Sequence, residues 1–202
     1  MSDRPRQLVV GVTGASGAPY AQRIIQLLTA ENIHVHLGVS PSGDRLLQDA
    51  LGMEGVDVEA LSGGRAERVT LHHYRDVGAP ISSGSFRHDG MIVVPCSSNT
   101  LAAIATGSQQ NLLHRAAMVS LKERRRLVLV HREMPLCLVD IRNMAAATES
   151  GAIICPAQPG FYMLPRTIDD LVDFVVGRVL DLVDVEHNLA IRWKQTPQGE
   201  TP

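Results

Sequence analysis

The sequence predicts an α/β fold, a single doubly wound sheet of the Rossmann or flavodoxin type that is mostly parallel and has helices on both faces. Three observations support this prediction. Apolar strand-like runs recur along the chain, segments of helical periodicity separate them, and a glycine-rich turn follows the first run. Such alternation is typical of parallel sheets. The chain has 202 residues, of which 45% are hydrophobic, which is enough for one core. We expect one domain over 1–202, with its core at about 7–186 and a tail at 187–202.

The expected strands are five apolar runs and a shorter sixth, and they lie at 7–13, 34–40, 68–74, 91–96, 127–131 and 152–157. After the first run, the apolar residues share one face of a helix, namely Ala21, Ile24, Ile25 and Leu28. The stretch at 52–67 predicts a loop or a weak helix. Because ligands of open α/β sheets bind beyond the carboxyl ends of the strands, the residues that follow each strand are the candidates for chemistry.

The first strand is followed by the turn GVTGASGAPYA at 11–21, with glycines at 11, 14 and 17. A tight turn that opens a helix directs backbone N–H groups at a phosphate or another electron-rich ligand. The spacing is GxxGxxG, which differs from the dinucleotide pattern GxGxxG. The second strand ends at Ser40, where an NAD-binding fold usually carries Asp or Glu. The two observations favour a mononucleotide or a phosphorylated small molecule.

The later strand ends carry hydroxyl, amide and ionisable groups. PCSSNT at 95–100 supplies Ser97, Ser98, Asn99 and Thr100, which can cap a helix or bind a ligand. HRE at 131–133 offers Arg132 as a phosphate clamp and Glu133 as a proton donor and acceptor. The last of these segments is PAQPGFY at 156–162, which follows the final predicted strand.

The last predicted helix carries an unusual cation. It begins at Thr167, whose spacing to Asp170 resembles a capping box. Arg178 falls on its apolar stripe, with Leu171, Val175 and Leu182. A guanidinium on an apolar face needs an anion, so we weigh a phosphate against an intersubunit salt bridge.

Composition and charge exclude several classes of protein. The formal net charge of -2 and the absence of a basic cluster interleaved with aromatics argue against a nucleic-acid partner, and KERRR at 122–126 is expected to cap a helix. Cys96, Cys137 and Cys155 are odd in number and lie in apolar segments, so we expect buried thiols in a reducing cytoplasm, without disulfides or a metal site. No apolar stretch approaches the roughly 20 residues of a membrane span.

Taken together, the motifs resemble the UbiX-type flavin prenyltransferases. The resemblance rests on GASGAPYA, SSGSF at 82–86, PCSSNTLAAIATG, LLHRAAMVSLKERRRLVLVHRE, PGFYMLPRTIDDLVDFVVGRVLD and a terminal RW, and it covers about residues 7 to 193. It implies a flavoprotein domain that binds FMN and transfers a dimethylallyl group from dimethylallyl phosphate to N5 and C6 of reduced FMN without a metal. It also implies that prenylated FMN goes to a UbiD-type decarboxylase, and that the chain forms a dodecamer with sites between subunits.

The resemblance assigns roles by motif. The implied flavin contacts are Gly14, Ala15, Ser16, Ser40, Ser97, Ser98, Asn99 and Thr100, with Ser16 near the reacting centre and Arg115 against the flavin at a subunit boundary. Arg132 contacts both flavin and donor. The residues implied to surround the donor phosphate are Lys122, Arg132, Tyr162 and Arg178. Glu133 would handle protons, and Trp193 with Tyr162 would supply aromatic cover. The catalytic set is therefore Ser16, Lys122, Glu133 and Tyr162.

The chain departs from the family pattern at three positions. Ala50 stands where members usually carry a Glu, with Asp49 and Glu54 as the nearest substitutes. Pro41 replaces a usual Lys, and His131 replaces a usual Pro and is expected to be a spectator. Two alternatives stay open. A flavin-dependent cysteine decarboxylase shares a PASANT-like motif but needs a PxMNxxMW segment that this chain lacks, and a non-catalytic FMN carrier would not need a second phosphate pocket. The sequence does not decide between a monophosphate and a diphosphate donor.

Overall fold

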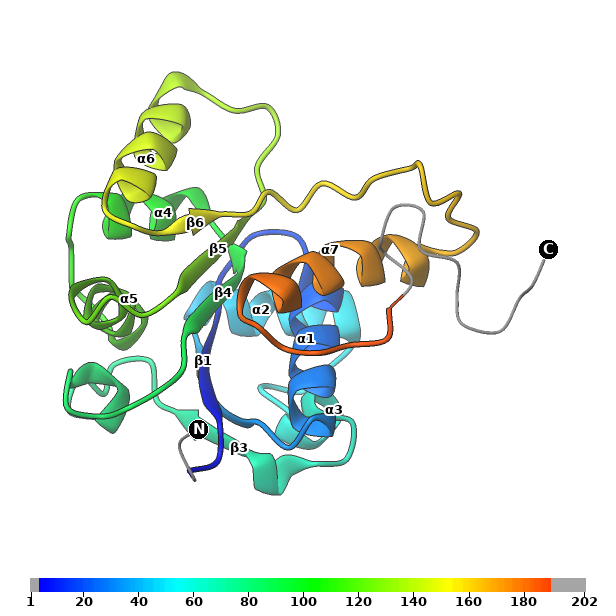
Figure 1. The fold of residues 1–202 in the computed structure, drawn as a ribbon, viewed down its shortest axis with the longest axis horizontal. Coiled ribbons are helices and arrows are strands. Elements are labelled where there is room, and N and C mark those ends of the chain that lie inside the picture. Colours follow the sequence, from blue (N-terminus) through cyan, green and yellow to red (C-terminus); the bar gives the residue numbers. More distant parts are fainter. Residues whose placement is uncertain (1–3, 190–202) are drawn as a thin grey trace.

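The protein forms a six-stranded sheet in the order β3-β2-β1-β4-β5-β6, in which every strand pair is parallel. The structure is a computed structural model and describes residues 4–189 (Figure 1). The strands are β1 (Gln7–Val12), β2 (His34–Val39), β3 (Val69–His72), β4 (Met91–Cys96), β5 (Leu127–His131) and β6 (Ile153–Ile154). The strand order reverses between β1 and β4, as in a doubly wound fold. The predicted fold class is confirmed.

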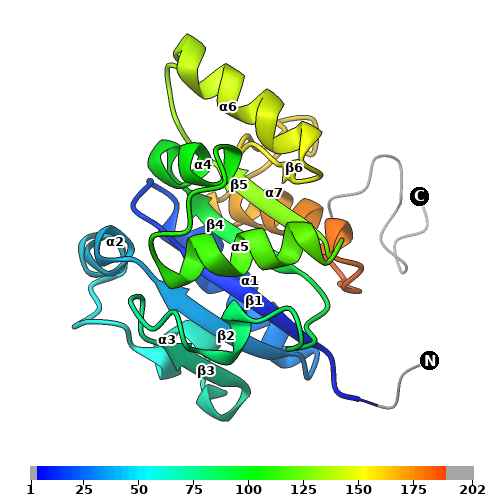
Figure 2. The same ribbon diagram turned by 90° about the vertical axis from the view of Figure 1, so that its left-hand side faces the viewer.

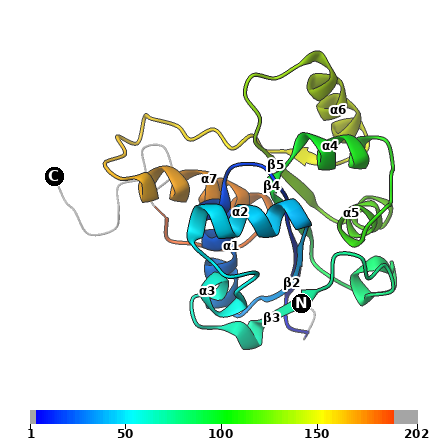
Figure 3. The same cartoon turned by 180° about the vertical axis from the view of Figure 1, so that it is seen from behind.

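Helices cover both faces of the sheet. They are α1 (Ala18–Ala30), α2 (Pro41–Leu51), α3 (Val58–Ser62), α4 (Ser98–Ala105), α5 (Leu112–Lys122), α6 (Leu138–Glu149) and α7 (Ile168–Leu182), with short 3-10 turns η1 (Ala66–Arg68) and η2 (Pro80–Ser82). Helices α1, α2, α3 and α7 pack on one face, and α4, α5, α6 and η2 pack on the other. Figure 2 looks onto α4, α5 and α6, and Figure 3 shows the same division from behind. No helix in residues 4–189 is long and apolar enough to cross a membrane.

The central strands are buried on both faces, which explains their continuous apolar runs. All six residues of β4 are buried, and all five of β5. One core contains Leu8, Val10 and Val12 of β1, and the other contains Val9 of the same strand, because side chains alternate between the faces. Core residues therefore pack against both faces of the sheet. They hold in place the carboxyl ends of the strands, which together form the carboxyl edge of the sheet.

The last strand is shorter than predicted, and the expected strand at 152–157 was wrong in length. Regular pairing covers Ile153 and Ile154 only. Because the N–H groups of a strand alternate between its two sides, the nitrogen of Pro156 faces the open side of the sheet, away from β5. Cys155 and Ala157 still donate their N–H groups to Leu129 O (2.9 Å) and His131 O (2.9 Å). The chain therefore continues beside the end of β5 before it leaves the sheet toward α7 (Figure 1).

Two predictions about cysteines have different outcomes. Cys96 is buried and Cys155 partly buried, in line with the expectation, and the three cysteines are all free. Cys137 is exposed, so the expectation of burial was wrong there. It lies at the N-cap of α6, where the end of a helix faces solvent.

A cluster of histidines lies on the α5 side of β2 and β3. His36 Nε2 is 2.9 Å from Gln7 Oε1, and His36 Nδ1 is 3.0 Å from His72 Nε2. His36 Nε2 donates to the Gln7 amide oxygen, and in the neutral imidazole Nδ1 accepts from His72 Nε2–H. Burial, helped by His34 and His72, lowers the pKa of His36 to about 4. Burial also lowers the pKa of His88 to about 4.

We expect the free energy of unfolding to fall as the pH drops from about 6.5 toward 4. In this window the unfolded chain binds protons that the folded histidines do not, so acid favours the unfolded state. A pKa of about 4 against an ordinary 6.5 corresponds to a loss of roughly 3 kcal/mol for His36 alone. Urea unfolding at neutral and mildly acidic pH measures it.

Two substitutions separate this effect from general acid sensitivity. His36→Gln should flatten the pH dependence, because it removes one of the groups whose pKa differs between the two states. His73→Gln should leave it unchanged, since His73 is exposed. An equally steep acid dependence in the His36 variant would contradict the assignment.

Candidate functional site

The site is built at the carboxyl ends of β1 and β4, where the strand order reverses. Thr13 joins the segments that follow these two strands. Its hydroxyl donates to Pro95 O (2.7 Å) and accepts a hydrogen bond from Ser97 N (2.9 Å). Because Thr13 is 2% exposed, this junction is shielded from water. It fixes the glycine turn next to the start of α4.

The glycine turn packs closely against α2. A Cβ atom added to Gly14 would lie 2.3 Å from Ser42 Cβ, so only glycine fits there. Gly17 has a φ of 140°, which disfavours any residue with a side chain. Gly14 and Ser16 are exposed above the strands. The turn and the N-terminus of α1 therefore offer backbone N–H groups to a ligand at this edge.

The hydroxyl residues at the ends of β2 and β4 cap helices, as one of the two sequence interpretations predicted. Ser40 Oγ accepts from Gly43 N at 3.0 Å and begins α2. Ser97 Oγ accepts from Thr100 N at 3.3 Å and donates to Thr100 Oγ1 at 3.2 Å. Thr100 is buried by this cap, whereas Asn99 is exposed. Their contact with a flavin stays a prediction.

A polar group connects α4, β5 and α6. Ser98 Oγ lies 3.2 Å from His131 Nε2 and 3.5 Å from Glu133 Oε2. Hydrogen bonds from Cys137, Ser98 and the Cys137 backbone lower the pKa of Asp140 to about 2. The His131 ring contacts Ser98, and the expectation that His131 is a spectator stays a prediction. No group of three or more His, Cys, Asp or Glu side chains within residues 4–189 could hold a metal ion.

Arg132 and Glu133 follow β5 and are both exposed at the same edge. Burial raises the pKa of Tyr20, and the charge of Arg132 opposes this rise, which indicates that Arg132 lies near the first turn of α1. Arg132 N also donates to Cys96 O at 3.3 Å, so the backbone after β5 is held against the end of β4. An anion bound at the N-terminus of α1 would therefore lie close to the guanidinium of Arg132.

Tyr162 packs against Phe174 of α7, and Arg178 follows on the same helix. The rings of Tyr162 and Phe174 are edge to face, with centroids 5.5 Å apart. Phe174 and Arg178 are four residues apart, so they share one face of the helix. The charge of Arg178 also acts on the thiol of Cys155, the residue after β6. Tyr162 and Arg178 thus lie along the β6 side of the edge, next to the segment that contacts His131.

The placement of Arg178 on the apolar stripe of this helix was wrong. Its side chain is 54% exposed, and its Nη1 donates to Asp181 Oδ2 at 2.9 Å. The buried residues of α7 are Val172, Val175, Val176, Gly177, Val179 and Leu180, so the buried face is rotated away from the stripe inferred from the sequence. Arg178 therefore has an anionic partner within the chain and can also reach a ligand from solvent.

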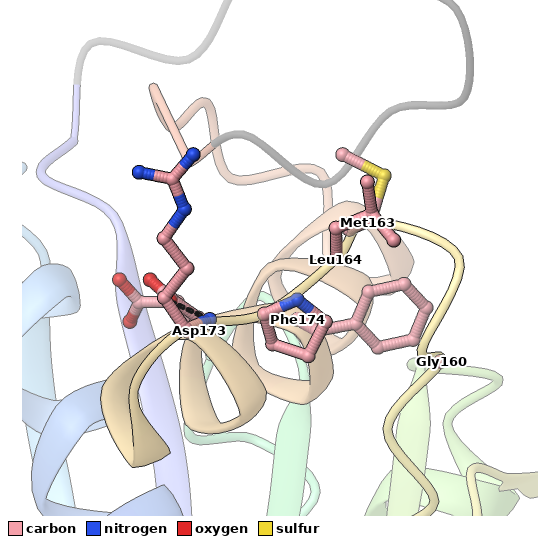
Figure 4. Close-up of a pocket in the computed structure, with 8 residues that line it drawn as sticks. Gly160, Met163, Leu164, Asp173 and Phe174 are labelled. Atoms are coloured by element: carbon pink, nitrogen blue, oxygen red, sulfur yellow. Dashed lines mark hydrogen bonds between the residues drawn. The ribbon is translucent and has the colours of Figure 1, made fainter.

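A cavity of about 310 Å³ lies beside Tyr162, on the outer side of α7. Figure 4 shows Gly160, Met163, Leu164 and Phe174 on its apolar side and Asp173 on its polar side. Asp173 is engaged by Arg23 at 2.7 Å, and Asp170 accepts from Thr167 N at 2.9 Å. Arg166, which also lines the cavity, and Arg23 offset the two carboxylates, so the cavity has no excess of positive charge with which to attract a phosphate.

Lys122 is not brought to this edge within one chain. Lys122 ends α5, ahead of β5, whereas Arg132 follows β5. A strand of that length separates the two ends by on the order of 15 Å. Lys122 Nζ pairs with Glu123 at 3.6 Å, and Arg115 Nε donates to Ser82 O at 3.1 Å. The predicted phosphate cluster that includes Lys122 therefore cannot form from a single subunit.

Of the departures from the family pattern, Pro41 and His131 follow or end strands at this edge, whereas Ala50 lies near the far end of α2. Asp49 pairs with Arg45 at 3.5 Å on the exposed side of α2, and both side chains are largely exposed. Ala50 and Glu54 are also exposed. Whether either acid takes the place of the missing Glu stays an open alternative of the sequence. Trp193 lies outside the described residues.

Sequence reasoning missed three residues of the site. No motif in the sequence singles out Thr13, Tyr20 or Asp140. Thr13 contacts Pro95 and Ser97, and Asp140 contacts Ser98, so these contacts join segments that are distant in the sequence. Tyr20 carried the one available signal, since it lies in the first turn of the helix, three residues after Gly17.

Comparison with known proteins places the chain in a class. A family profile described as Flavoprotein matches residues 1–180. The fold, and the site at the carboxyl ends of its strands, are thus those of a flavoprotein. The flavin prenyltransferase UbiX of Halalkalibacterium halodurans is 45% identical over 188 residues, which cover 91% of this chain and 91% of that protein. The chain belongs to the UbiX-type flavin prenyltransferase family.

Solved structures agree with this assignment. The crystal structure of AnUbiX (PadA1) in complex with FMN and dimethylallyl pyrophosphate has a TM-score of 0.89 and 44% sequence identity, over 96% of this chain and 100% of that one. The dodecameric FMN-dependent UbiX-like decarboxylase from Escherichia coli O157:H7 has a TM-score of 0.85 and 43% identity, over 94% and 100%. The FMN-dependent cysteine decarboxylase TvaF is 15% identical with a TM-score of 0.60, which is a likeness of fold alone.

Proposed function

We propose that this chain is a flavin prenyltransferase that transfers a dimethylallyl group from dimethylallyl phosphate to N5 and C6 of reduced FMN. The observation that carries the proposal is the meeting of a glycine turn, capped helix N-termini and an exposed Arg132–Glu133 pair at the point where the strand order reverses. Its nearly full-length similarity to flavin prenyltransferases supports the same reaction. Prenylated FMN is the product.

The residues of this edge suit FMN. The close packing of Gly14 on Ser42 leaves the backbone of the turn open, so a planar ring can approach it. The N-termini of α1, α2 and α4 point to this edge and favour the flavin phosphate. The exposed Ser16 and Asn99 can then hydrogen-bond the ring edge. Reduced FMN supplies the electron-rich atoms that form the new carbon–nitrogen and carbon–carbon bonds.

The residues around the prenyl donor act as a cationic clamp. Arg132 and Arg178, with the Tyr162 hydroxyl, can bind a dianionic phosphate and stabilise it as it leaves. Glu133 is positioned to take up or return a proton at the flavin or at the departing phosphate. A monophosphate is our proposed donor, and the diphosphate seen with AnUbiX is the other substrate to assay.

The proposed assembly is a homo-dodecamer, as in the related protein from Escherichia coli. Exposed apolar side chains support a large oligomer. Met134, Leu138, Val139 and Ile141 lie on one stretch before and within α6, and Phe161 and Leu164 lie on the segment before α7. A neighbouring subunit would also supply Lys122, which one chain does not bring to the edge, and Arg115 would lie against the flavin at the subunit boundary. We further propose that a UbiD-type decarboxylase receives the prenylated FMN. We also propose that the protein is located in the cytoplasm, where free cysteines persist.

Anaerobic incubation with reduced FMN and dimethylallyl phosphate, followed by mass spectrometry of the extracted flavin, tests the function. We expect a flavin heavier by one five-carbon prenyl unit, and none when the donor is omitted. FMN that binds but stays unmodified with either donor would refute the enzyme and favour a carrier. Decarboxylation of a peptide with a C-terminal cysteine would instead indicate the cysteine decarboxylase reaction.

A further inference from the structure

Arg115 is held by two oxygen atoms that carry no formal charge. Its Nε donates to the backbone oxygen of Ser82 at 3.1 Å, and its Nη1 donates to the side chain of Gln109. A guanidinium has only N–H donors, so the Gln109 amide must present its oxygen and not its nitrogen. No carboxylate within residues 4–189 forms an ion pair with Arg115. The two contacts therefore orient the guanidinium and leave its positive charge in place.

Arg115 lies in the first turn of α5, close to the carboxyl edge of the sheet. The side chain of Leu113, two residues earlier, packs on β1 and β2. A Cβ atom added to Gly11 or to Gly38 would lie 3.1 Å or 2.6 Å from it. Each of these glycines comes one residue before its strand ends. The start of α5, and with it Arg115, is therefore at the end of the sheet where FMN is proposed to bind.

Gln109 lies in the short connection between α4 and α5, and the backbone of this connection is anchored on both sides of it. Ser108 N donates to Ala103 O, near the end of α4, at 2.8 Å. Asn111 caps α5, because its Oδ1 accepts from His114 N at 3.0 Å. These anchors limit the positions that the Gln109 side chain can reach. Its amide oxygen is thus held in place beside Arg115 before any ligand binds.

We propose that Gln109 is a positioning residue for Arg115, whose guanidinium it directs toward the flavin without neutralising it. Within the described part of the chain, Ser82 and Gln109 engage two of the five N–H donors of this side chain, which leaves three for a ligand. FMN carries an anionic phosphate, and an anion binds best to a cation whose charge no carboxylate offsets. The inference rests on the proposed function, in which Arg115 lies against the flavin.

Titration of the protein with oxidised FMN, in the absence of a prenyl donor, measures the effect. Gln109→Met keeps the length of the side chain and removes the acceptor. The Kd of FMN should then rise about five- to tenfold, because Arg115 is no longer oriented. Gln109→Glu keeps an acceptor but should raise the Kd at least as much, because its carboxylate offsets the guanidinium charge. If the chain prenylates flavin, the methionine variant should have a higher KM for reduced FMN, with kcat and the KM for dimethylallyl phosphate unchanged.

Further variants show whether Gln109 acts through Arg115. In an Arg115→Ala background, Gln109→Met should cause no further loss of FMN affinity, because the residue through which it acts is gone. Gln110→Met is the matched control and should bind FMN like the wild type, since Gln110 is exposed on the same connection and is not a partner of Arg115. Native mass spectrometry should show the same oligomer for every variant.

Several outcomes would overturn the inference. They are an unchanged Kd in Gln109→Met, an equal loss with and without Arg115, wild-type affinity in Gln109→Glu, and weaker binding that accompanies a changed oligomer. The failure of the proposed function has a different signature. A chain whose variants bind FMN as expected, but which forms no prenylated FMN, refutes the prenyltransferase and leaves the positioning role of Gln109 standing.

Discussion

Replacing Glu133 by Gln should lower the rate of flavin prenylation about 10²- to 10⁴-fold and leave FMN affinity nearly unchanged, because the amide keeps the shape but cannot exchange a proton. The loss should appear in the chemical step, since the exposed carboxylate at the end of β5 is proposed to serve the reaction and not the fold. Single-turnover measurements with reduced FMN and excess dimethylallyl phosphate separate that step from binding.

The matched control is Glu149→Gln. Glu149 is likewise exposed, but it ends α6. This variant should react at nearly the wild-type rate. A Glu133 variant that prenylates flavin within a few fold of the wild type would remove Glu133 from the mechanism and leave proton transfer to solvent.

Mixed oligomers should recover activity from two variants that are each inactive. Lys122→Ala and Glu133→Gln should each reduce prenylation at least about 10²-fold, because one weakens the phosphate clamp and the other the proton transfer. Lys122 lies at the far end of β5 from Glu133, so the two act in one site only when they come from different subunits. Refolded together in equal amounts, the variants should regain about one quarter of the wild-type sites by random pairing.

Control mixtures keep this result interpretable. Each variant refolded alone should stay inactive, and a double variant mixed with either single variant should recover nothing. Recovery that fails in a mixture shown by native mass spectrometry to contain both chains would mean that Lys122 does not complete a neighbour's site. Full activity of Lys122→Ala alone would show that the prenyl phosphate is held without it.

Features that depend on neighbouring residues were predictable from the sequence. The caps of α2 and α4 follow from Ser40 and Ser97, which precede helical segments, and the capping box of α7 at Thr167 is confirmed. Each of these contacts closes within three residues. The pattern of side chains along the sequence therefore contains the information that specifies them.

Features that depend on the packing of separate elements were not predictable in the same way. Apolar residues are spread over more than half of α7, so periodicity alone did not identify its buried face, and Arg178 was placed on the wrong stripe. The bonds of Ser98 with His131 and Glu133 span 33 and 35 residues. Such contacts depend on strand order and register, which a single sequence does not state.

The brevity of the outermost strands limits how these proteins can associate. β6 has two residues and β3 has four, so the sheet presents little unpaired backbone on either side. Long exposed edges are templates for runaway strand addition, which leads to fibres and precipitates. In the proposed oligomer, copies of this chain would instead contact one another through side chains on helices and loops. The short outer strands would then protect a protein held at high local concentration against aggregation.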